Sequence, residues 1–76
     1  MTQLLAFDLK EGMLVALVYR GSSVHGQVDV ALSAEDRKDI PFQAFRLENG
    51  DLLCLMIDDR GEFWDVEGRR IRVYGR

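Results

Sequence analysis

The second half of this chain is divided into short apolar runs by turn-forming residues, and this spacing is the strongest constraint on its fold. Turns are expected at residues 48–51 (ENGD), 58–62 (DDRGE) and 66–69 (VEGR). Between and beside them lie FQAFRL, LLCLMI, EFWDV and RRIRVY, each short enough to be a single strand. Short strands separated at regular intervals by Gly, Asn and Asp are typical of an antiparallel meander.

The first half adds two longer candidate strands. MLVALVY (13–19) is apolar throughout, and Gly12 and Gly21 mark its two ends. In VHGQVDVAL (24–32), apolar residues and one glycine alternate strictly with polar residues up to Val30. Alternation of this kind indicates a strand with one buried face.

One short helical turn is expected near residues 33–39. Ser33 can act as the N-cap with Asp36 three residues later, a variant of the capping box. Pro41 disfavours helical backbone at Ile40, so the helix is limited to one or two turns. The predicted fold class is all-β and mainly antiparallel, a small barrel or a curled meander sheet with this one helical turn. The order of elements is similar to SH3-like and other small β-barrels.

Length and composition predict a single globular domain over residues 1–76. Seventy-six residues leave no room for a linker and a second core. A hydrophobic content of 47% beside 30% charge favours a folded chain, since enough apolar surface is available to offset chain entropy. A domain of this size buries only about 60% of its unfolded surface. Such domains often gain stability from a disulfide, a metal or a partner chain.

A partner chain is the device that this sequence favours. Cys54 is the single cysteine, which excludes an internal disulfide and fits a reducing, cytoplasmic location. Residues 1–7 lack a signal-peptide pattern, and the longest apolar run is far shorter than the ~20 residues that span a bilayer. We therefore expect a soluble protein with no membrane association and no bound cofactor.

The turns also predict how the strands pair. Residues 49–50 and 67–68 are expected to form two-residue turns, and residues 59–61 a three-residue loop with a bulge. The first of these turns would pair Phe45 with Cys54, the loop 59–61 would pair Met56 with Trp64, and the turn 67–68 would pair Trp64 with Ile71. One face of the resulting sheet is wholly apolar and is the predicted core. It contains Phe45, Leu47, Leu52, Cys54, Met56, Trp64, Val66, Ile71 and Val73.

The opposite face of the same sheet is also rich in apolar residues, although a face in contact with water should be largely polar. A contiguous exposed apolar patch commonly marks an interaction surface. We therefore predict self-association through this face, most simply as a two-fold dimer. The alternative is that the N-terminal segment TQLLAFDL folds back and covers it. The predicted interface consists of Phe42, Leu53, Leu55, Ile57 and Phe63.

The C-terminal run GRRIRVYGR (68–76) contains four arginines and no acidic residue. In the structural interpretation, Arg70 pairs with Asp65 across a hairpin and Arg72 lies over the Phe63 ring. In the functional interpretation, a basic and aromatic sheet face stacks bases and neutralises phosphates. The net charge of −3 and the pI near 5.0 favour the structural interpretation. The possible polyanion contact consists of Arg46, Arg70 and Arg72.

No group of residues forms a recognisable catalytic, cofactor-binding or metal site. Cys54 is expected to pack as a small hydrophobe and to react slowly, and a dyad with His25 would join two separate strands. Asp58, Asp59 and Glu62 lack the ligand spacing of a calcium loop. We therefore predict a non-catalytic binding module that self-associates. A nucleic-acid-binding barrel is the alternative, and an enzyme formed between subunits is the third possibility.

Overall fold

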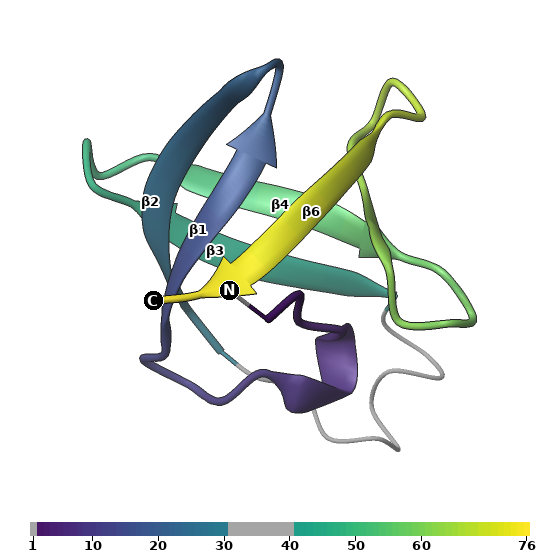
Figure 1. Ribbon diagram of the computed structural model, residues 1–76, viewed down its shortest axis with the longest axis horizontal. Helices are drawn as coiled ribbons and strands as arrows, with labels where there is room; N and C mark the ends of the chain where they lie inside the picture. The colour runs from purple at the N-terminus through teal and green to yellow at the C-terminus, as the bar shows by residue number, and fades with distance from the viewer. Residues whose placement is uncertain (1, 31–40) are drawn as a thin grey trace.

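The computed structural model describes residues 2–30 and 41–76, which form a closed barrel of six antiparallel strands (Figure 1). In chain order the strands are β1 (Leu14–Tyr19), β2 (Ser22–Val28), β3 (Phe42–Leu47), β4 (Leu52–Ile57), β5 (Phe63–Trp64) and β6 (Arg70–Gly75). Each strand pairs with the next, and β6 returns to β1. The predicted all-β fold class is confirmed. The helical turn expected at 33–39 lies outside the described residues.

The first strand pair follows the sequence pattern closely. β1 and β2 are joined by a two-residue turn in which Arg20 and Gly21 both have positive φ, 52° and 77°. These are the signs that a type I′ hairpin turn requires. In β2, Gly26 and Val28 are buried and His25 is exposed, as the alternation predicted.

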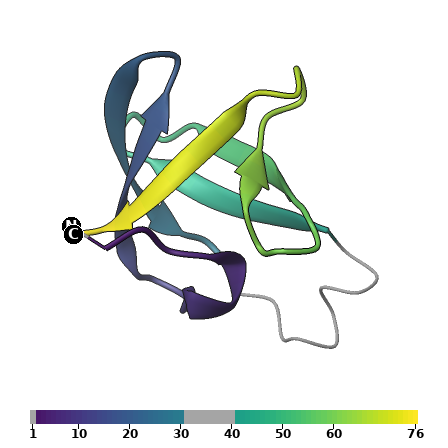
Figure 2. The ribbon, with the colours of Figure 1, turned by 45° about the vertical axis from the view of Figure 1, so that its right-hand side comes forward.

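The N-terminal segment covers one end of the barrel and contains a 3-10 turn, η1 (Ala6–Asp8). Ala6 and Leu9 are buried in the core. The backbone N–H of Leu4 donates to the carbonyl oxygen of Val73 at 2.7 Å, so the segment runs beside β6 and the two chain ends lie close together (Figure 2). Within the two described ranges, no helix is long and apolar enough to cross a membrane.

The core fills the interior of the barrel. Phe45 and Phe63 meet edge to face with their ring centroids 5.6 Å apart, an arrangement that aromatic pairs favour. Aliphatic side chains from the other strands surround the two rings. The buried apolar residues include Val15, Leu17, Val28, Leu55, Ile71 and Val73.

The prediction for β4 was wrong by one residue. Loop 48–50 contains three residues rather than two, and Gly50 occupies its last position with φ of 90°. Phe45 consequently pairs with Leu53 instead of Cys54. Because a shift of one residue exchanges the two faces of a strand, the β4 side chains assigned to the core point outward. These side chains are Leu52, Cys54 and Met56.

The β5–β6 turn, residues 66–68, also contains three residues rather than two. Phe63 therefore pairs with Ile71, in place of the predicted pair of Trp64 with Ile71. Phe63 enters the core, where its ring is not available to Arg72, and Trp64 is only partly buried.

The two shifts compensate for each other at the end of the chain. The pair of Met56 with Trp64 forms as predicted, because loop 59–61 has the expected three residues. In both β4 and β5, the side chains predicted to face the core therefore face outward, and those predicted to face outward are inside. The second shift restores β6, so that Ile71 and Val73 are buried as predicted, whereas Val66 is 86% exposed instead of buried.

Candidate interaction surface

The outer face of β3, β4 and β5 carries adjacent apolar side chains. Phe42 pairs with Met56, and Met56 pairs with Trp64, so three large side chains form a row across three strands. Phe42 is 47% exposed and Met56 is 43% exposed. We call this surface the β3–β5 face. It consists of Phe42, Leu52, Cys54, Met56 and Trp64.

The composition of β4 explains why this face is apolar. LLCLMI has apolar residues at both alternating sets of positions, so whichever set enters the core leaves the other in water. In the structure Leu55 is fully buried and Leu52 is 51% exposed. Sequence reasoning assigned the members of the β3–β5 face, apart from Phe42, to the core and therefore missed them as surface residues.

Trp64 is held in the face through Asp58. The indole N–H of Trp64 donates to Asp58 Oδ2 at 2.8 Å, and the backbone N–H groups of Arg60 and Glu62 donate to Asp58 Oδ1, each at 2.9 Å. The bond from Trp64, followed by the backbone bonds, lowers the pKa of the Asp58 carboxyl. The polar edge of the indole is thus tied to the loop 59–61.

The residues predicted as the interface lie mostly on the inner side of the barrel. Leu55 and Phe63 are buried, and Leu53 and Ile57 are partly buried against the core. Of the five, Phe42 alone belongs to the β3–β5 face. The prediction that these side chains share an exposed face was wrong, because the β4 register places them inside a closed barrel. Self-association itself stays a prediction.

The arginines of the possible polyanion contact lie beside acidic residues. Arg70 Nη2 is 2.9 Å from Glu62 Oε1, and Arg46 Nη2 is 3.5 Å from Asp29 Oδ1. Arg72 is exposed on β6. Because β4 and β5 separate Arg46 on β3 from the two arginines of β6, the three side chains do not form a continuous basic patch.

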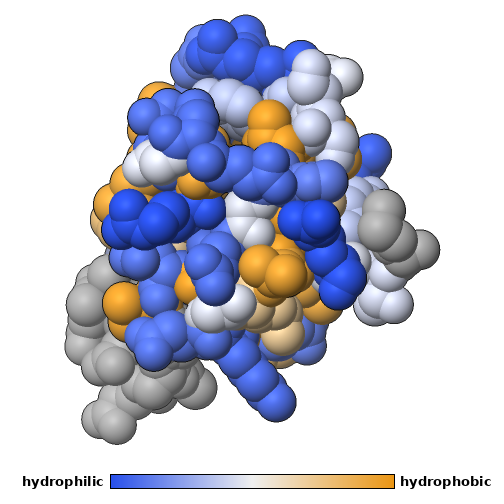
Figure 3. All heavy atoms as spheres, turned by 90° about the vertical axis from the view of Figure 1, so that its left-hand side faces the viewer, coloured by the Kyte–Doolittle hydropathy of each residue, from blue (hydrophilic) through white to orange (hydrophobic). Residues whose placement is uncertain are grey.

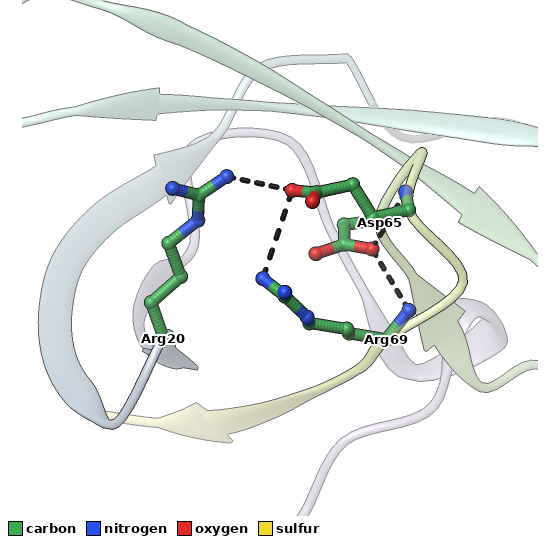
Figure 4. A network of polar contacts seen from close by, with 4 residues as sticks. Arg20, Asp65 and Arg69 are labelled. Carbon is green, nitrogen blue, oxygen red and sulfur yellow. Dashed lines mark hydrogen bonds and ion pairs between the residues drawn. The ribbon is translucent and has the colours of Figure 1, made fainter.

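Asp65, which was predicted to pair with Arg70, instead organises the β5–β6 turn. Its Oδ1 accepts the backbone N–H groups of Glu67 and Arg69 at 2.9 and 2.8 Å. Above the turn, Arg20 Nη2 lies 2.6 Å and Arg69 Nη1 3.7 Å from Glu67 Oε1 (Figure 4). Glu67 thus forms ion pairs with both Arg20 and Arg69. Of the two, Arg69 belongs to the C-terminal arginines, and its pairing makes it less available to phosphates.

A second surface feature is an open hollow of about 310 Å³ between β2 and the β3–β4 loop. Glu48 Oε1 lies at its rim, 3.4 Å from His25 Nδ1 and 3.7 Å from Arg76 Nη1. On the side of the molecule shown in Figure 3, hydrophobic residues lie in small groups separated by hydrophilic ones. The hollow is at the lower size limit of ligand pockets. Its lining consists of Ser23, Val24, His25, Leu47, Glu48 and Asn49.

The remaining chemical candidates are placed as follows. Cys54 is exposed, in contrast to its predicted position in the core. The oxygens of Asp58 are engaged by Trp64 and the loop, as described above. Among the described residues, no three His, Cys, Asp or Glu side chains are grouped so that they could hold a metal ion.

Comparison with known proteins adds no further information. No protein-family model, curated protein or solved structure matches this chain. The fold and the exposure of its side chains therefore provide the basis for a functional proposal.

Proposed function

We propose that this protein is a non-catalytic interaction module that self-associates through the β3–β5 face. The observation that supports the proposal is the row of Phe42, Met56 and Trp64, which lies on the outer side of three adjacent strands. Covering a half-exposed apolar side chain of this size contributes about 1 kcal/mol, or half the value for complete burial. A partner that covers several side chains of this face, Leu52 among them, would therefore gain several such contributions.

A second copy of the chain is the simplest partner for such a face. A two-fold axis brings the same patch of each copy together, so a single apolar surface satisfies both. Small domains have a narrow stability margin, which association widens. We further propose a reducing, cytoplasmic setting, since the exposed thiol of Cys54 would otherwise be open to oxidation.

Sedimentation velocity over a range from low to high micromolar concentration tests the proposal. We expect the wild-type protein to dimerise and Leu52→Glu to remain a folded monomer, because a charge would be buried at the interface. Val66→Glu is the matched control, since Val66 is apolar and 86% exposed but lies in the β5–β6 turn outside the face. A wild-type protein that is monomeric throughout the range, or two variants that dissociate equally, would refute the proposal.

A second candidate function is single-stranded nucleic-acid binding. It is favoured by the pairing of Arg70 with Trp64, which places a cation beside a partly exposed aromatic ring on the outer surface. The ion pair of Arg70 with Glu62 opposes it. Binding to a single-stranded RNA oligonucleotide that weakens with salt, and that is lost when Arg70 and Arg72 are both changed to Gln, would promote this function over self-association. An Arg60→Gln variant controls for the loss of surface charge.

A further inference from the structure

β5 is shorter than the strand with which it pairs. β4 pairs with β3 from Leu52 to Met56, whereas β5 pairs only with Met56 and Ile57. Residues 52–54 therefore have a neighbouring strand on one side only. In the part of the chain that the structure describes, no other strand pairs with their free side. The barrel wall thus keeps a short open edge, which we call the β4 edge (residues 52–54).

The β3–β4 hydrogen bonds show which backbone groups the β4 edge offers. At the far end of β4, the N–H of Ile57 donates to the carbonyl oxygen of Pro41 at 2.7 Å. Backbone groups of a strand point alternately to its two neighbours, so Leu53 also bonds toward β3. The N–H and C=O groups of Leu52 and Cys54 therefore point away from β3, toward the open side.

The other open stretches of the barrel wall are covered or polar. Beyond β5, the edge of β6 bonds to the N-terminal segment, through Leu4 N–H to Val73 O at 2.7 Å and Gly75 N–H to Thr2 O at 3.4 Å. The part of β2 that lies outside its pairing with β3, SSVH (22–25), contains three polar residues and the partly buried Val24. Proteins protect open strand edges with charge, proline, bulges or a covering segment.

Among the described residues, nothing protects the β4 edge in these ways. Its residues are Leu, Leu and Cys, without a charge or a proline, and Leu52 and Cys54 are exposed. An unprotected apolar edge of this kind is a site for pairing with another strand. It is also complementary to itself, because an antiparallel pair of identical edges is related by a two-fold axis.

We infer that the β4 edge pairs antiparallel with the β4 edge of a second copy, about a two-fold axis at Leu53. The inference rests on the proposed self-association and places the contact at the Leu52 and Cys54 end of the β3–β5 face. Leu52 then lies opposite the partner's Cys54, and Cys54 opposite the partner's Leu52, so that about four backbone hydrogen bonds form. On the outer side, each large Leu52 lies opposite a small Cys54 of the other copy, so the two strands can approach closely. Leu52 and Cys54 of each β3–β5 face are then covered on this side by the same two residues of the partner.

A Leu52→Cys variant tests this register by disulfide formation. Opposed residues that exchange hydrogen bonds have Cα atoms about 5.5 Å apart, inside the ~4.4–6.8 Å range of disulfides. In the wild-type dimer the two Cys54 residues are diagonal neighbours at roughly 7–8 Å, at or beyond that range. Diamide serves as the oxidant and takes up the two electrons and two protons that each pair of thiols loses when the S–S bond forms.

We expect Leu52→Cys to give a cross-linked dimer at least about tenfold faster than wild type, because the paired thiols have a millimolar effective concentration. Leu14→Cys is the control, since Leu14 is 53% exposed on β1, away from the edge. Peptide mapping should join position 52 of one chain to Cys54 of the other. If sedimentation shows a dimer but Leu52→Cys reacts no faster than Leu14→Cys, the edge pairing is wrong while the proposed function stands.

A second pair of variants is independent of thiol chemistry. Cys54→Pro removes the outward N–H, which takes no part in the β3–β4 ladder, and proline is tolerated on edge strands. Cys54→Ala keeps that N–H. We expect sedimentation to show loss of the dimer in the proline variant only, with both variants folded by circular dichroism. Equal dimerisation of the two folded variants would overturn the inference, and a monomeric wild type would overturn it together with the proposed function.

Discussion

The orientation of β4 can be tested by truncating two adjacent side chains. Leu55 is completely buried in the core cluster that contains Phe45 and Phe63, whereas Met56 is 43% exposed on the outer face. Leu55→Ala should therefore leave a cavity in the core, and Met56→Ala should remove mainly surface contacts. The register predicted from the sequence alone gives the reverse order, because it places Met56 inside.

The expected magnitudes differ enough to separate the two registers. Removing a buried leucine side chain costs about 2–5 kcal/mol, and complete burial here places Leu55→Ala near ~3 kcal/mol. Met56→Ala should cost about 1 kcal/mol, since only about half of its surface is withdrawn from water. A domain of this length has a total stability of roughly 4–11 kcal/mol. Leu55→Ala would therefore consume much of the margin.

Urea unfolding provides the measurement, with the fluorescence of Trp64 as the signal and the protein diluted until the midpoint no longer depends on concentration. At about 4–8 °C per kcal/mol for a domain of this size, Leu55→Ala should also lower the Tm by more than ~10 °C. If Met56→Ala proves more damaging than Leu55→Ala, β4 faces the other way and the reasoning about both the core and the β3–β5 face fails.

Three further outcomes are expected. Asp58→Ala should cost about 1–2 kcal/mol at neutral pH. Because the pKa of Asp58 is lowered in the folded state, the stability that its ionised carboxylate adds is present above the ordinary value of 3.8 and is lost as pH falls through the lowered pKa. The urea midpoint of the variant should therefore fall less steeply in acid than that of the wild-type protein. Cys54 should react promptly with a thiol reagent in dilute native buffer, and labelling that requires unfolding would contradict its exposure. Gly26→Ala should destabilise the barrel by roughly 1–3 kcal/mol in thermal unfolding, since the added Cβ would lie 3.0 Å from the Arg46 carbonyl oxygen, and unchanged stability would contradict that contact.

The strand order was predictable because turn residues and alternation carry direct backbone information. Gly21 and Gly61 were correctly assigned to turns, and both have the positive φ that glycine adopts without strain. The strict alternation before Val30 identified the buried side of β2, because its polar side chains could not enter the core. These features were sufficient for the fold class.

The face of β4 could not be predicted in the same way. An apolar run such as LLCLMI satisfies the core in either orientation, so the assignment depended entirely on the length of the preceding loop. Asn49-Gly50 favours a two-residue turn, but Glu48 joins them in a three-residue loop. The pattern of hydrophobic residues offered no check on this choice.

A signal for the β5–β6 turn was present in the sequence. Asp58 and Asp65 each precede a glycine by three residues, in DDRG and DVEG. In the structure, Oδ1 of each aspartate accepts the backbone N–H groups two and four residues later. Both turns consequently have three residues with glycine last, and the correct assignment of the first would have transferred to the second.

The reversed register leaves the physical argument for association intact while exchanging the residues that carry it. Because β4 is apolar at every position, one set of its side chains must face outward, and the closed barrel determines that the set is Leu52, Cys54 and Met56. The N-terminal segment, which was the alternative cover, contributes Ala6 and Leu9 to the same core cluster as the inward-facing Leu55 of β4. Intrachain cover and self-association are therefore not competing explanations of one surface. The segment covers one side of the sheet, and a second copy is proposed for the other.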